Sequence, residues 1–324
     1  HLISAKNLPK VIQEIIFEET NKIKSFYDTC EGRRSLQKTL RDKFGEPLFF
    51  RLLFWEPSLR TVCSFQDAIR ALGGEYETTQ HAGKFSSAAK GEKIIATTRI
   101  LGKRCDGIII RHDNKKEQNA LKKSADTCEA YNLKTKIINA GDGANEHPTQ
   151  MLLDMCTIWS LKKHEFLSGN LTYGFIGDIE HSRTIHSNLI ALKDYGAKKI
   201  YLISEENNNL PDWLVNETKD LPLEKIAYLL EVAPELDIGY FTRYQSERKS
   251  QSKYDSAYYA EKFGATDEFI GITKESAFFL HPLPHGKEYR EHLDLLDPRF
   301  IHHQQADNGF YVRMALIKLM FGRE

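Results

Sequence analysis

The chain has 324 residues, which is long for one hydrophobic core and sufficient for two domains of ordinary size. Its 45 basic and 45 acidic residues give a net charge of zero, which excludes a global field for nucleic acid or an anionic membrane but not a local cationic pocket. No apolar run reaches the roughly 18 residues of a membrane span, the N-terminus lacks a signal-peptide core, and the scattered cysteines form no C-x-x-C pair. We therefore expect a cytoplasmic protein without disulfides or a zinc site.

The first half of the chain alternates apolar, strand-like runs with helical stretches. It opens with an amphipathic helix that has apolar residues at helical spacing from Val11 to Tyr27. The strands predicted next are Leu48–Phe54, Gly107–Arg111 and Lys136–Ala140, and the helices are Thr61–Leu72, Lys93–Leu101, Lys115–Tyr131 and Pro148–Leu161. Strands separated by helices indicate a parallel sheet that is covered on both faces.

The second half repeats this alternation, with polar loops at 207–209 and 246–253. Its predicted strands are Leu171–Ile176, Lys199–Ser204, Leu236–Phe241 and Ala277–His281, and its helices are Thr184–Tyr195 and Tyr311–Phe321. We expect an α/β fold with two domains, each a mainly parallel sheet flanked by helices, and an active site in the cleft between them. Residues 1–150, completed by a C-terminal helix near 306–324, form the first domain and residues 151–305 the second.

The most informative segment is the turn between the first predicted strand and the helix that follows it. Ser58, Arg60 and Thr61 place two hydroxyls and a guanidinium where the N–H groups of a new helix are unpaired. Free amides, a helix dipole and a guanidinium are the groups that hold a phosphate. An ordinary helix cap by Ser58 with a solvated Arg60 fits the turn equally well, so the turn by itself leaves both interpretations open.

Further polar residues follow other predicted strands, where open α/β sheets bind their ligands. Arg111 ends one strand, and His147 and Gln150 open the helix at 148–161, so that the three suit a planar carbonyl–amide group. Arg183 and Arg243 follow strands of the second half and suit bidentate carboxylates, which predicts a dicarboxylate or an acidic amino acid as ligand. A dinucleotide is disfavoured because the chain has no G-x-G-x-x-G there.

Taken together, these motifs resemble those of aspartate carbamoyltransferase catalytic chains over nearly the whole length. The matching segments are Glu56–Thr61, Ser86–Glu92, Arg111–His112, Asn139–Gln150, Gly177–Ser187, Thr242–Arg248, His281–Pro284 and Asp307–Gly309. The sister family of ornithine carbamoyltransferases is disfavoured by Thr242–Arg248 and by Pro282, where that family typically has a cysteine.

The resemblance implies that the carbamoyl group of carbamoyl phosphate is transferred to the amine of L-aspartate, giving N-carbamoyl-L-aspartate and phosphate in pyrimidine biosynthesis. It implies that Ser58, Arg60 and Thr61 bind the phosphate, that Thr61, Arg111 and His147 donate to the carbonyl oxygen, and that Gln150 holds the carbamoyl amide. For aspartate it implies Arg183, Arg243, Gln245 and the backbone at Leu283. Ser86 and Lys90 would enter the site of a neighbouring subunit, Lys90 also reaching aspartate, and Glu56 would pair with Arg183 and Arg248 to close the domains. The site is then shared within a homotrimer that needs no cofactor and no metal; a regulatory or dihydroorotase partner stays open.

Three positions depart from the family pattern. The family usually reads Ser-Thr-Arg-Thr-Arg where this chain has 58–62, so that Leu59 lacks a hydroxyl and Val62 a second guanidinium. His285 replaces the arginine that usually follows the His-Pro-Leu-Pro segment. We expect a working enzyme with a weakened carbamoyl phosphate site, and two alternatives stay open: a carbamoyltransferase for another amino acid, and a catalytically silent subunit of an assembly.

Overall fold

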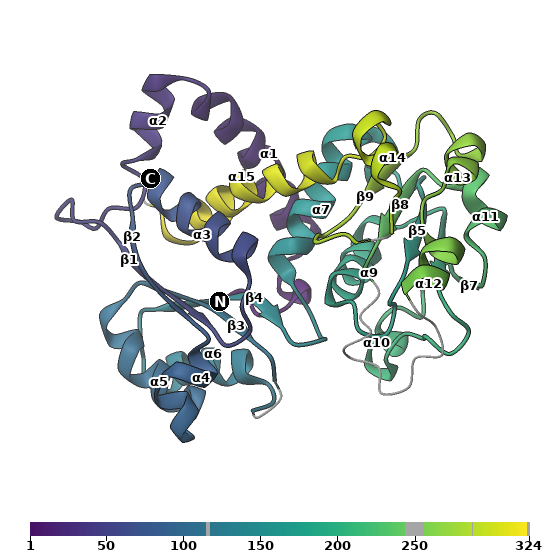
Figure 1. Ribbon diagram of the computed structural model, residues 1–324. Coiled ribbons are helices and arrows are strands. Elements are labelled where there is room, and N and C mark those ends of the chain that lie inside the picture. Colours follow the sequence, from purple (N-terminus) through teal and green to yellow (C-terminus); the bar gives the residue numbers. More distant parts are fainter. Residues whose placement is uncertain (115–116, 244–255, 287, 323–324) are drawn as a thin grey trace. The chain divides into compact units, whose positions relative to one another are not determined.

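The computed structural model describes residues 1–114, 117–243, 256–286 and 288–322. The chain divides into two compact units, which we call unit 1 (residues 1–152 with 308–324) and unit 2 (residues 153–307) (Figure 1). Within the described ranges, no helix is both long enough and apolar enough to cross a membrane.

Unit 1 contains a four-stranded sheet and the helices that cover it. Its elements are α1 (Lys10–Tyr27), α2 (Cys30–Leu36), β1 (Phe49–Phe54), α3 (Leu59–Ala71), β2 (Glu75–Gln80), α4 (Ala82–Phe85), α5 (Ile94–Leu101), β3 (Gly107–His112), α6 (Ala120–Ala130), β4 (Lys136–Asp142), the start of α7 (Pro148–Leu161), most of α15 (His302–Phe321), and the 3₁₀ helices η1 (Ala5–Asn7), η2 (Ser87–Lys90) and η3 (Gly102–Arg104).

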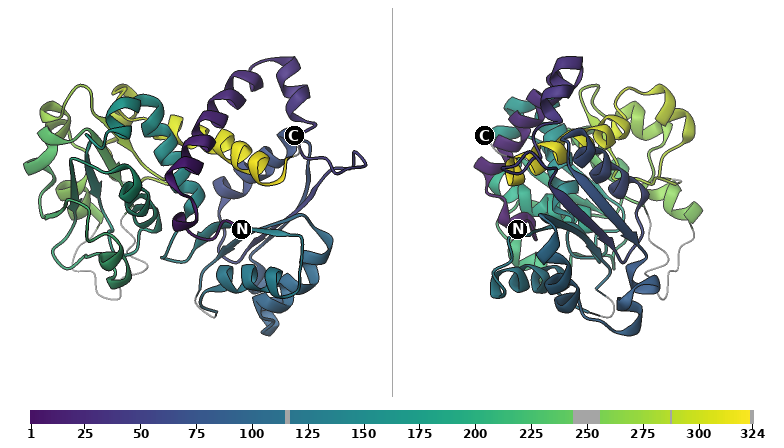
Figure 2. Two further views of the ribbon diagram at one scale, coloured as in Figure 1. Left: turned by 180° about the vertical axis from the view of Figure 1, so that it is seen from behind. Right: turned by 90° about the vertical axis from the view of Figure 1, so that its left-hand side faces the viewer.

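The sheet of unit 1 has the order β2-β1-β3-β4 and all of its pairs are parallel. Every residue of β3 is buried, as expected for a central parallel strand with helices on both faces. Helices α5 and α6 pack on one face against Leu53, Ile108 and Ile110. Helices α3 and α15 lie on the other face, where Phe321 packs edge-on against Phe50 (Figures 1 and 2). The predicted parallel sheet with helices on both faces is therefore confirmed for this unit.

Unit 2 contains a five-stranded sheet. Its elements are the remainder of α7, α8 (Lys163–Leu167), β5 (Thr172–Ile176), α9 (Arg183–Tyr195), β6 (Lys199–Ile203), α10 (Asp212–Glu217), β7 (Leu223–Ile226), α11 (Leu229–Val232), η4 (Ala233–Glu235), β8 (Ile238–Phe241), α12 (Ser256–Phe263), α13 (Asp267–Ile272), β9 (Phe278–Leu280), α14 (Glu291–Leu296) and the start of α15.

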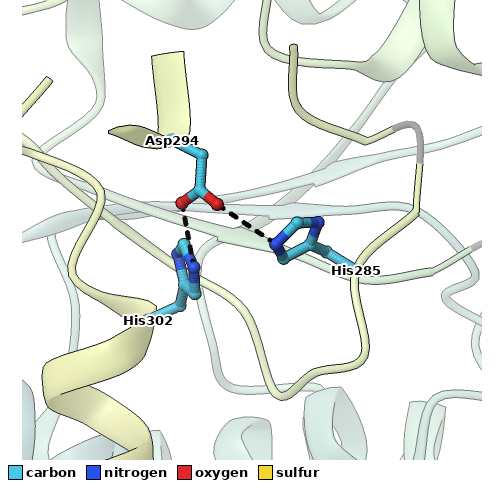
Figure 3. A group of neighbouring side chains, drawn as sticks. All are labelled: His285, Asp294 and His302. Atoms are coloured by element: carbon cyan, nitrogen blue, oxygen red, sulfur yellow. Dashed lines mark ion pairs between the residues drawn. The ribbon is translucent and has the colours of Figure 1, made fainter. Parts of the chain in front are cut away.

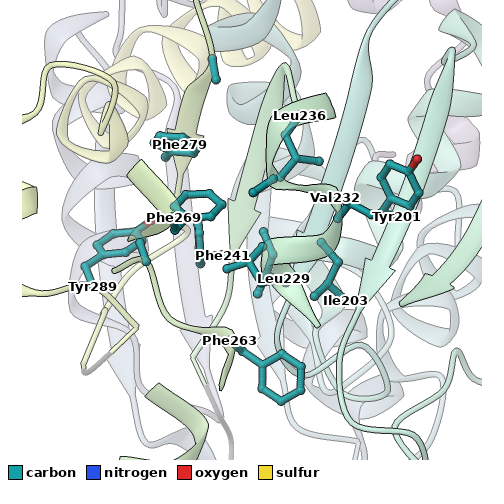
Figure 4. Packing of buried hydrophobic residues seen from close by; sticks show 14 of the residues in the cluster. Tyr201, Ile203, Leu229, Val232, Leu236, Phe241, Phe263, Phe269, Phe279 and Tyr289 are labelled. Carbon is teal, nitrogen blue, oxygen red and sulfur yellow. The ribbon is translucent and has the colours of Figure 1, made fainter. Parts of the chain in front are cut away.

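The sheet of unit 2 is again wholly parallel, with the order β7-β6-β5-β8-β9. One face carries an aromatic core in which Phe241, Phe269, Phe279 and Tyr289 pack with ring centroids 5.1 to 6.2 Å apart (Figure 4). Tyr240 points to the opposite face because side chains alternate along a strand. Helices thus cover both faces here as well, and the predicted fold class is confirmed.

Two strands were not predicted, and both lie at sheet edges. Strand β2 reads Glu-Tyr-Glu-Thr-Thr-Gln and β7 reads Leu-Glu-Lys-Ile, so neither forms the apolar run by which the other strands were found. An edge strand has one neighbour and a more exposed surface, which permits polar residues. The helix predicted to begin at Lys115 begins at Ala120, and the one predicted from Tyr311 begins at His302. The predicted loop at 246–253 lies outside the described residues.

Candidate functional site

In unit 1 the order of the strands reverses between β1 and β3, because β2 and β3 lie on opposite sides of β1. Arg111 near the end of β3 pairs in register with Phe54 at the end of β1. The N–H of Trp55 then donates to the carbonyl of Arg111 across 2.8 Å. The turn that follows β1 therefore starts beside Arg111, at the type of switch point where open α/β sheets bind ligands.

The turn after β1 leads directly into the N-terminus of α3. Ser58 occupies the N-cap position with extended backbone (φ −156°), yet its hydroxyl makes no capping hydrogen bond. The capping hydrogen bond from the Ser58 side chain, one of the two interpretations of the sequence, is therefore absent. Thr61 is buried at 8% exposure, whereas Leu59 is 74% exposed.

Arg60 projects from this turn as an exposed residue that has no ion-pair or hydrogen-bond partner among the described residues. Partial burial of its guanidinium lowers the pKa of Arg60, but the group stays charged at neutral pH. Val62 is 2% exposed and belongs to the buried side of α3. The expectation that Val62 deprives the phosphate of a second guanidinium stays a prediction.

Arg111 itself is nearly buried, at 8% exposure. Its Nη2 lies 3.0 Å from Oε2 of Glu56, the residue just before the turn. This ion pair fixes the Arg111 guanidinium relative to the start of α3. The pairing of Glu56 with Arg183 and Arg248 stays a prediction, and Arg248 lies outside the described residues.

His147 and Gln150 stand at the N-terminus of α7, which follows β4. The carbonyl of His147 accepts the N–H groups of Gln150 (3.0 Å) and Met151 (3.1 Å), so His147 begins the helix. Its side chain is buried, with 3% exposure. Because β4 pairs with β3 and His112 is in register with Asp142, this helix start belongs to the same sheet edge as Arg111. Unit 1 therefore presents two helix N-termini and Arg111 at the carboxyl ends of three adjacent strands.

Two supporting residues of unit 1 were not identified from the sequence. Glu146 accepts hydrogen bonds from the Ser4 hydroxyl and the Ala5 N–H, both at 2.7 Å, and thereby fixes the loop before His147; burial raises its pKa. His112 accepts the N–H of Asn114 at Nδ1 (3.0 Å), and burial lowers its pKa, so its imidazole is neutral at pH 7. Both residues lie inside segments that match the family, but no sequence pattern assigns a role to either side chain, so only the fold reveals its supporting contacts.

In unit 2 the order of the strands reverses between β5 and β8. Thr242, which follows β8, donates to the carbonyl of Ile176 through its N–H (2.8 Å) and its hydroxyl (3.0 Å). Gly177 lies against it with φ +124°, and a Cβ added there would come within 2.3 Å of the Thr242 hydroxyl. This contact requires glycine and keeps the segments after β5 and β8 together.

The two arginines predicted in unit 2 follow these two segments. Arg183 is the first residue of α9, and Arg243 is the residue after Thr242; both are half-buried. The structure thus places both residues after neighbouring strands, at the same edge of the sheet. Gln245, predicted to act with them, lies outside the described residues.

A buried hydrogen-bond network supports Leu283, which has φ +58°. The Leu283 N–H donates to His281 Nδ1 (2.8 Å), and the His281 N–H donates to Gln305 Oε1 (2.9 Å). Gln305 in turn donates to the fully buried carboxylate of Asp154 (2.6 Å), which also accepts the Tyr240 hydroxyl (2.7 Å). Burial and the Asp154 charge raise the pKa of Tyr240, which keeps it a donor. The one sequence signal for this network is that Asp154 is the single charged residue of α7.

Ser86 and Lys90 occupy the segment between α4 and α5. The Ser86 hydroxyl donates to the carbonyl of Ala82 at 2.5 Å, and Lys90 ends η2 as an exposed residue. A role for either residue in a neighbouring subunit stays a prediction.

Comparison with known families gives a match to both halves of the chain. Residues 1–160 match the aspartate/ornithine carbamoyltransferase carbamoyl-P binding domain, and residues 169–320 match the Asp/Orn binding domain of the same family. Chloroplastic aspartate carbamoyltransferase of Arabidopsis thaliana is 38% identical over 92% of this chain and 74% of its own length. The aspartate carbamoyltransferase catalytic subunit of Aliivibrio fischeri is 34% identical over 99% of this chain and 96% of its own.

Solved structures agree with these relatives. The catalytic subunit of M. Jannaschii aspartate transcarbamoylase superposes with a TM-score of 0.82 at 30% identity, over 98% of this chain and 96% of that one. Aspartate transcarbamoylase from Trypanosoma cruzi in complex with N-(phosphonacetyl)-L-aspartic acid gives 0.81 at 27% identity, over 98% and 94%. The chain therefore belongs to the aspartate/ornithine carbamoyltransferase family and is a relative of aspartate carbamoyltransferase catalytic chains.

Proposed function

We propose that this chain is an aspartate carbamoyltransferase, which transfers the carbamoyl group of carbamoyl phosphate to the amine of L-aspartate. The observation that carries the proposal is common to both units. At each switch point a helix that follows one strand starts at the sheet edge where an arginine ends or follows the neighbouring strand: α3 and Arg111 in unit 1, and α9 and Arg243 in unit 2. A helix N-terminus with a guanidinium is an anion site, and the reaction needs two anionic ligands.

In unit 1 the phosphate of carbamoyl phosphate is assigned to the N-terminus of α3, with Ser58, Arg60 and Thr61. The carbonyl oxygen is assigned to Thr61, Arg111 and His147, and the carbamoyl amide to Gln150. The buried position of His147 and the ion pair of Arg111 support a fixed arrangement of these donors. Fixed donors stabilise the negative charge that develops on the carbonyl oxygen, an effect worth about 2.7–4 kcal/mol per donor in other enzymes.

In unit 2 the two carboxylates of aspartate are assigned to Arg183, Arg243 and Gln245, and the backbone at Leu283 positions the amine. The amine nitrogen attacks the carbonyl carbon, the bond from that carbon to the phosphate oxygen breaks, and the departing phosphate accepts the amine proton. No other reactant is consumed. Binding both substrates in fixed orientation lowers the entropic barrier to their encounter.

The finer assignments also belong to this proposal. We assign Ser86 and Lys90 to the site of a neighbouring subunit, which makes the enzyme a homotrimer with shared sites, and we place the reaction in pyrimidine biosynthesis in the cytoplasm. The exposed position of Lys90 supports a contact with another chain. Glu56 is assigned to domain closure with Arg183 and Arg248; its ion pair with Arg111 is then exchanged when substrate binds.

The reaction is tested by a steady-state assay of the purified chain at saturating carbamoyl phosphate. L-aspartate should give N-carbamoyl-L-aspartate and phosphate in equal amounts, and L-ornithine should give no citrulline. Turnover of a different amino acid in place of aspartate would support the first alternative. If the chain binds phosphate but turns over no amino acid, the result would support the alternative of a catalytically silent subunit. The exposed Leu59 is the reason for considering this alternative.

Shared sites are tested by mixing two impaired variants, Lys90→Ala and Arg243→Ala, after mild dissociation and reassembly, in an assay at an aspartate concentration well below the KM of the Arg243→Ala variant. In the proposed shared site, Arg243 comes from one subunit and Lys90 from its neighbour, so each variant lacks the contribution of a different subunit. Random assortment of subunits in a cyclic trimer should restore activity at roughly a quarter of the sites. A mixture as inactive as its components would exclude sharing of the site through Lys90.

A further inference from the structure

Three side chains of the kind that bind transition metals meet in unit 2, apart from the residues assigned to the reaction. His285 lies in the segment after β9, Asp294 in α14, and His302 is the first residue of α15. Oδ2 of Asp294 is 3.2 Å from Nε2 of His285, and its Oδ1 is 2.9 Å from Nε2 of His302. Figure 3 shows the carboxylate between the two rings, with one oxygen directed toward each.

The imidazole of His302 is fully buried, with 0% side-chain exposure, but neither of its ring nitrogens has a hydrogen-bond partner in the described part of the chain. The short distance to Asp294 is therefore a contact without hydrogen-bond geometry. Nδ1 of His285 also lacks a partner there. A buried polar group left without a partner costs about 1–3 kcal/mol, so the arrangement is incomplete as the side chains stand.

An ion pair with a protonated His302 is a weak explanation of this arrangement. Nε2 of His302 lies 2.9 Å from the carboxylate but makes no hydrogen bond with it, and the ring is fully buried. A neutral imidazole presents a lone pair, which is the state that binds a metal, and a carboxylate beside it supplies the negative charge.

We propose that His285, Asp294 and His302 form a binding site for a divalent transition metal ion, with Zn²⁺ as the best fit. All three ligand atoms lie within 4.8 Å of one another. Ligands at about 2.0–2.2 Å from a tetrahedral Zn²⁺ are about 3.3–3.6 Å apart. The two observed separations, 3.2 and 2.9 Å, run to different oxygens of Asp294, so a small rotation of the carboxylate would let one oxygen bind the ion together with both rings. Two histidines and one carboxylate are a known zinc ligand set, and the fourth position would hold water.

The site would connect three segments of unit 2 that belong to separate elements of the fold. It would tie the segment that carries Leu283 and His285 to α14 and to the start of α15. Tyr289 packs against both histidine rings, with centroids 5.4 and 5.6 Å away, and limits their movement. The ion therefore has a structural role, and the carbamoyl transfer has no step through it.

The test uses the purified full-length chain without an affinity tag, stripped of metal by a chelator and dialysed. Co²⁺ is the probe because its visible absorption reports on nitrogen and oxygen ligands in a tetrahedral field. We expect saturable binding of one Co²⁺ per chain, bleaching of the absorption by one equivalent of Zn²⁺, and a Tm that rises with Zn²⁺ concentration. A chain that binds no Co²⁺ saturably would overturn the proposal.

Three variants separate this site from binding by other histidines. His285→Arg removes a ligand but introduces a cation that can still pair with Asp294, so the fold is retained. His302→Gln removes the buried ligand, and His303→Gln is the matched control, because His303 is the exposed neighbour of His302. The first two should weaken Co²⁺ binding by more than about 10-fold, since loss of even an outer-shell partner costs that much, and His303→Gln should not. Unchanged binding in His285→Arg, or equal loss in all three, would contradict the assignment.

Discussion

The two candidate half-sites are built on the same topological feature but depend on different chemistry. In unit 1 much of the proposed binding surface is the backbone at the start of α3, whose intrahelical hydrogen bonds begin with the N–H of Val62, and the register of β1 and β3 places this start beside Arg111. In unit 2 the proposed recognition rests on the side chains of Arg183 and Arg243, which follow the two segments that the contact of Gly177 with Thr242 keeps together. A site built from backbone N–H groups tolerates a changed side chain such as Leu59. In a site built from guanidiniums, no other group replaces one that is lost. We therefore expect substitutions in unit 1 to weaken carbamoyl phosphate binding to different degrees. Substitutions in unit 2 should weaken the binding of aspartate selectively.

Arg60→Ala is expected to have the largest effect on the unit 1 half-site. Arg60 is exposed and without a partner among the described residues, so its removal should leave the fold intact. We expect kcat/KM for carbamoyl phosphate to fall about 100- to 1,000-fold, the loss seen when one preorganised donor is removed. Steady-state kinetics at saturating aspartate measure this fall in kcat/KM. Arg70→Ala, at the other end of α3, is the control and should change little; similar losses in both would show that the helix, rather than the phosphate contact, is affected.

Arg243→Ala should affect unit 2 selectively. Removing one charge-assisted hydrogen bond to a carboxylate costs about 1.5–3 kcal/mol, so we expect KM for aspartate to rise about 10- to 100-fold. KM for carbamoyl phosphate should change far less. Arg290→Ala removes an exposed arginine of the same unit that pairs with Asp267 and serves as the control. An equal loss for both substrates would contradict the assignment of Arg243 to aspartate.

Leu59→Thr tests whether the backbone site in unit 1 is incomplete. Leu59 is 74% exposed at the start of α3, so a threonine hydroxyl there faces solvent and the proposed phosphate. We expect KM for carbamoyl phosphate to fall by up to about 10-fold, the low end of the value of a hydrogen bond to a charged group, with KM for aspartate nearly unchanged. Leu59→Ala removes the leucine without adding a hydroxyl and should not reproduce the gain. If both variants behave alike, the leucine itself obstructs the site.

The smallest effect concerns the buried support of unit 1. Burial lowers the pKa of His112 below its ordinary value of 6.5, so the unfolded chain takes up a proton at higher pH than the folded chain does. Stability should therefore fall as pH drops from about 6.5 through the lowered pKa, and it should be independent of this group above about 6.5. Urea unfolding of the wild type and of His112→Gln across this range measures the difference, which should shrink toward low pH. His164→Gln, at an exposed position, should leave the profile unchanged.

Sequence reasoning located the central strands and the long helices because burial on both faces leaves a continuous apolar run, as in β3 and β5. It failed at β2 and β7, since edge strands carry polar residues and give no such run. It could not tell that Val62 lies on the buried side of α3, because this depends on how the helix packs. Supporting residues such as Asp154 and Glu146 were not found, because their hydrogen-bond partners lie in other elements of the fold, well away from them in the chain.

By itself, the sequence determined the fold class, the family and the chemical types at the two half-sites, because these depend on local patterns: apolar runs, helix starts and arginines after strands. The tertiary structure alone decided which groups face one another. The order of parallel strands placed the switch points, the phase of each helix decided which side chains are buried, and contacts between separate elements brought His285, Asp294 and His302 together. Such contacts join residues that share no local pattern, and therefore only the packed chain reveals them.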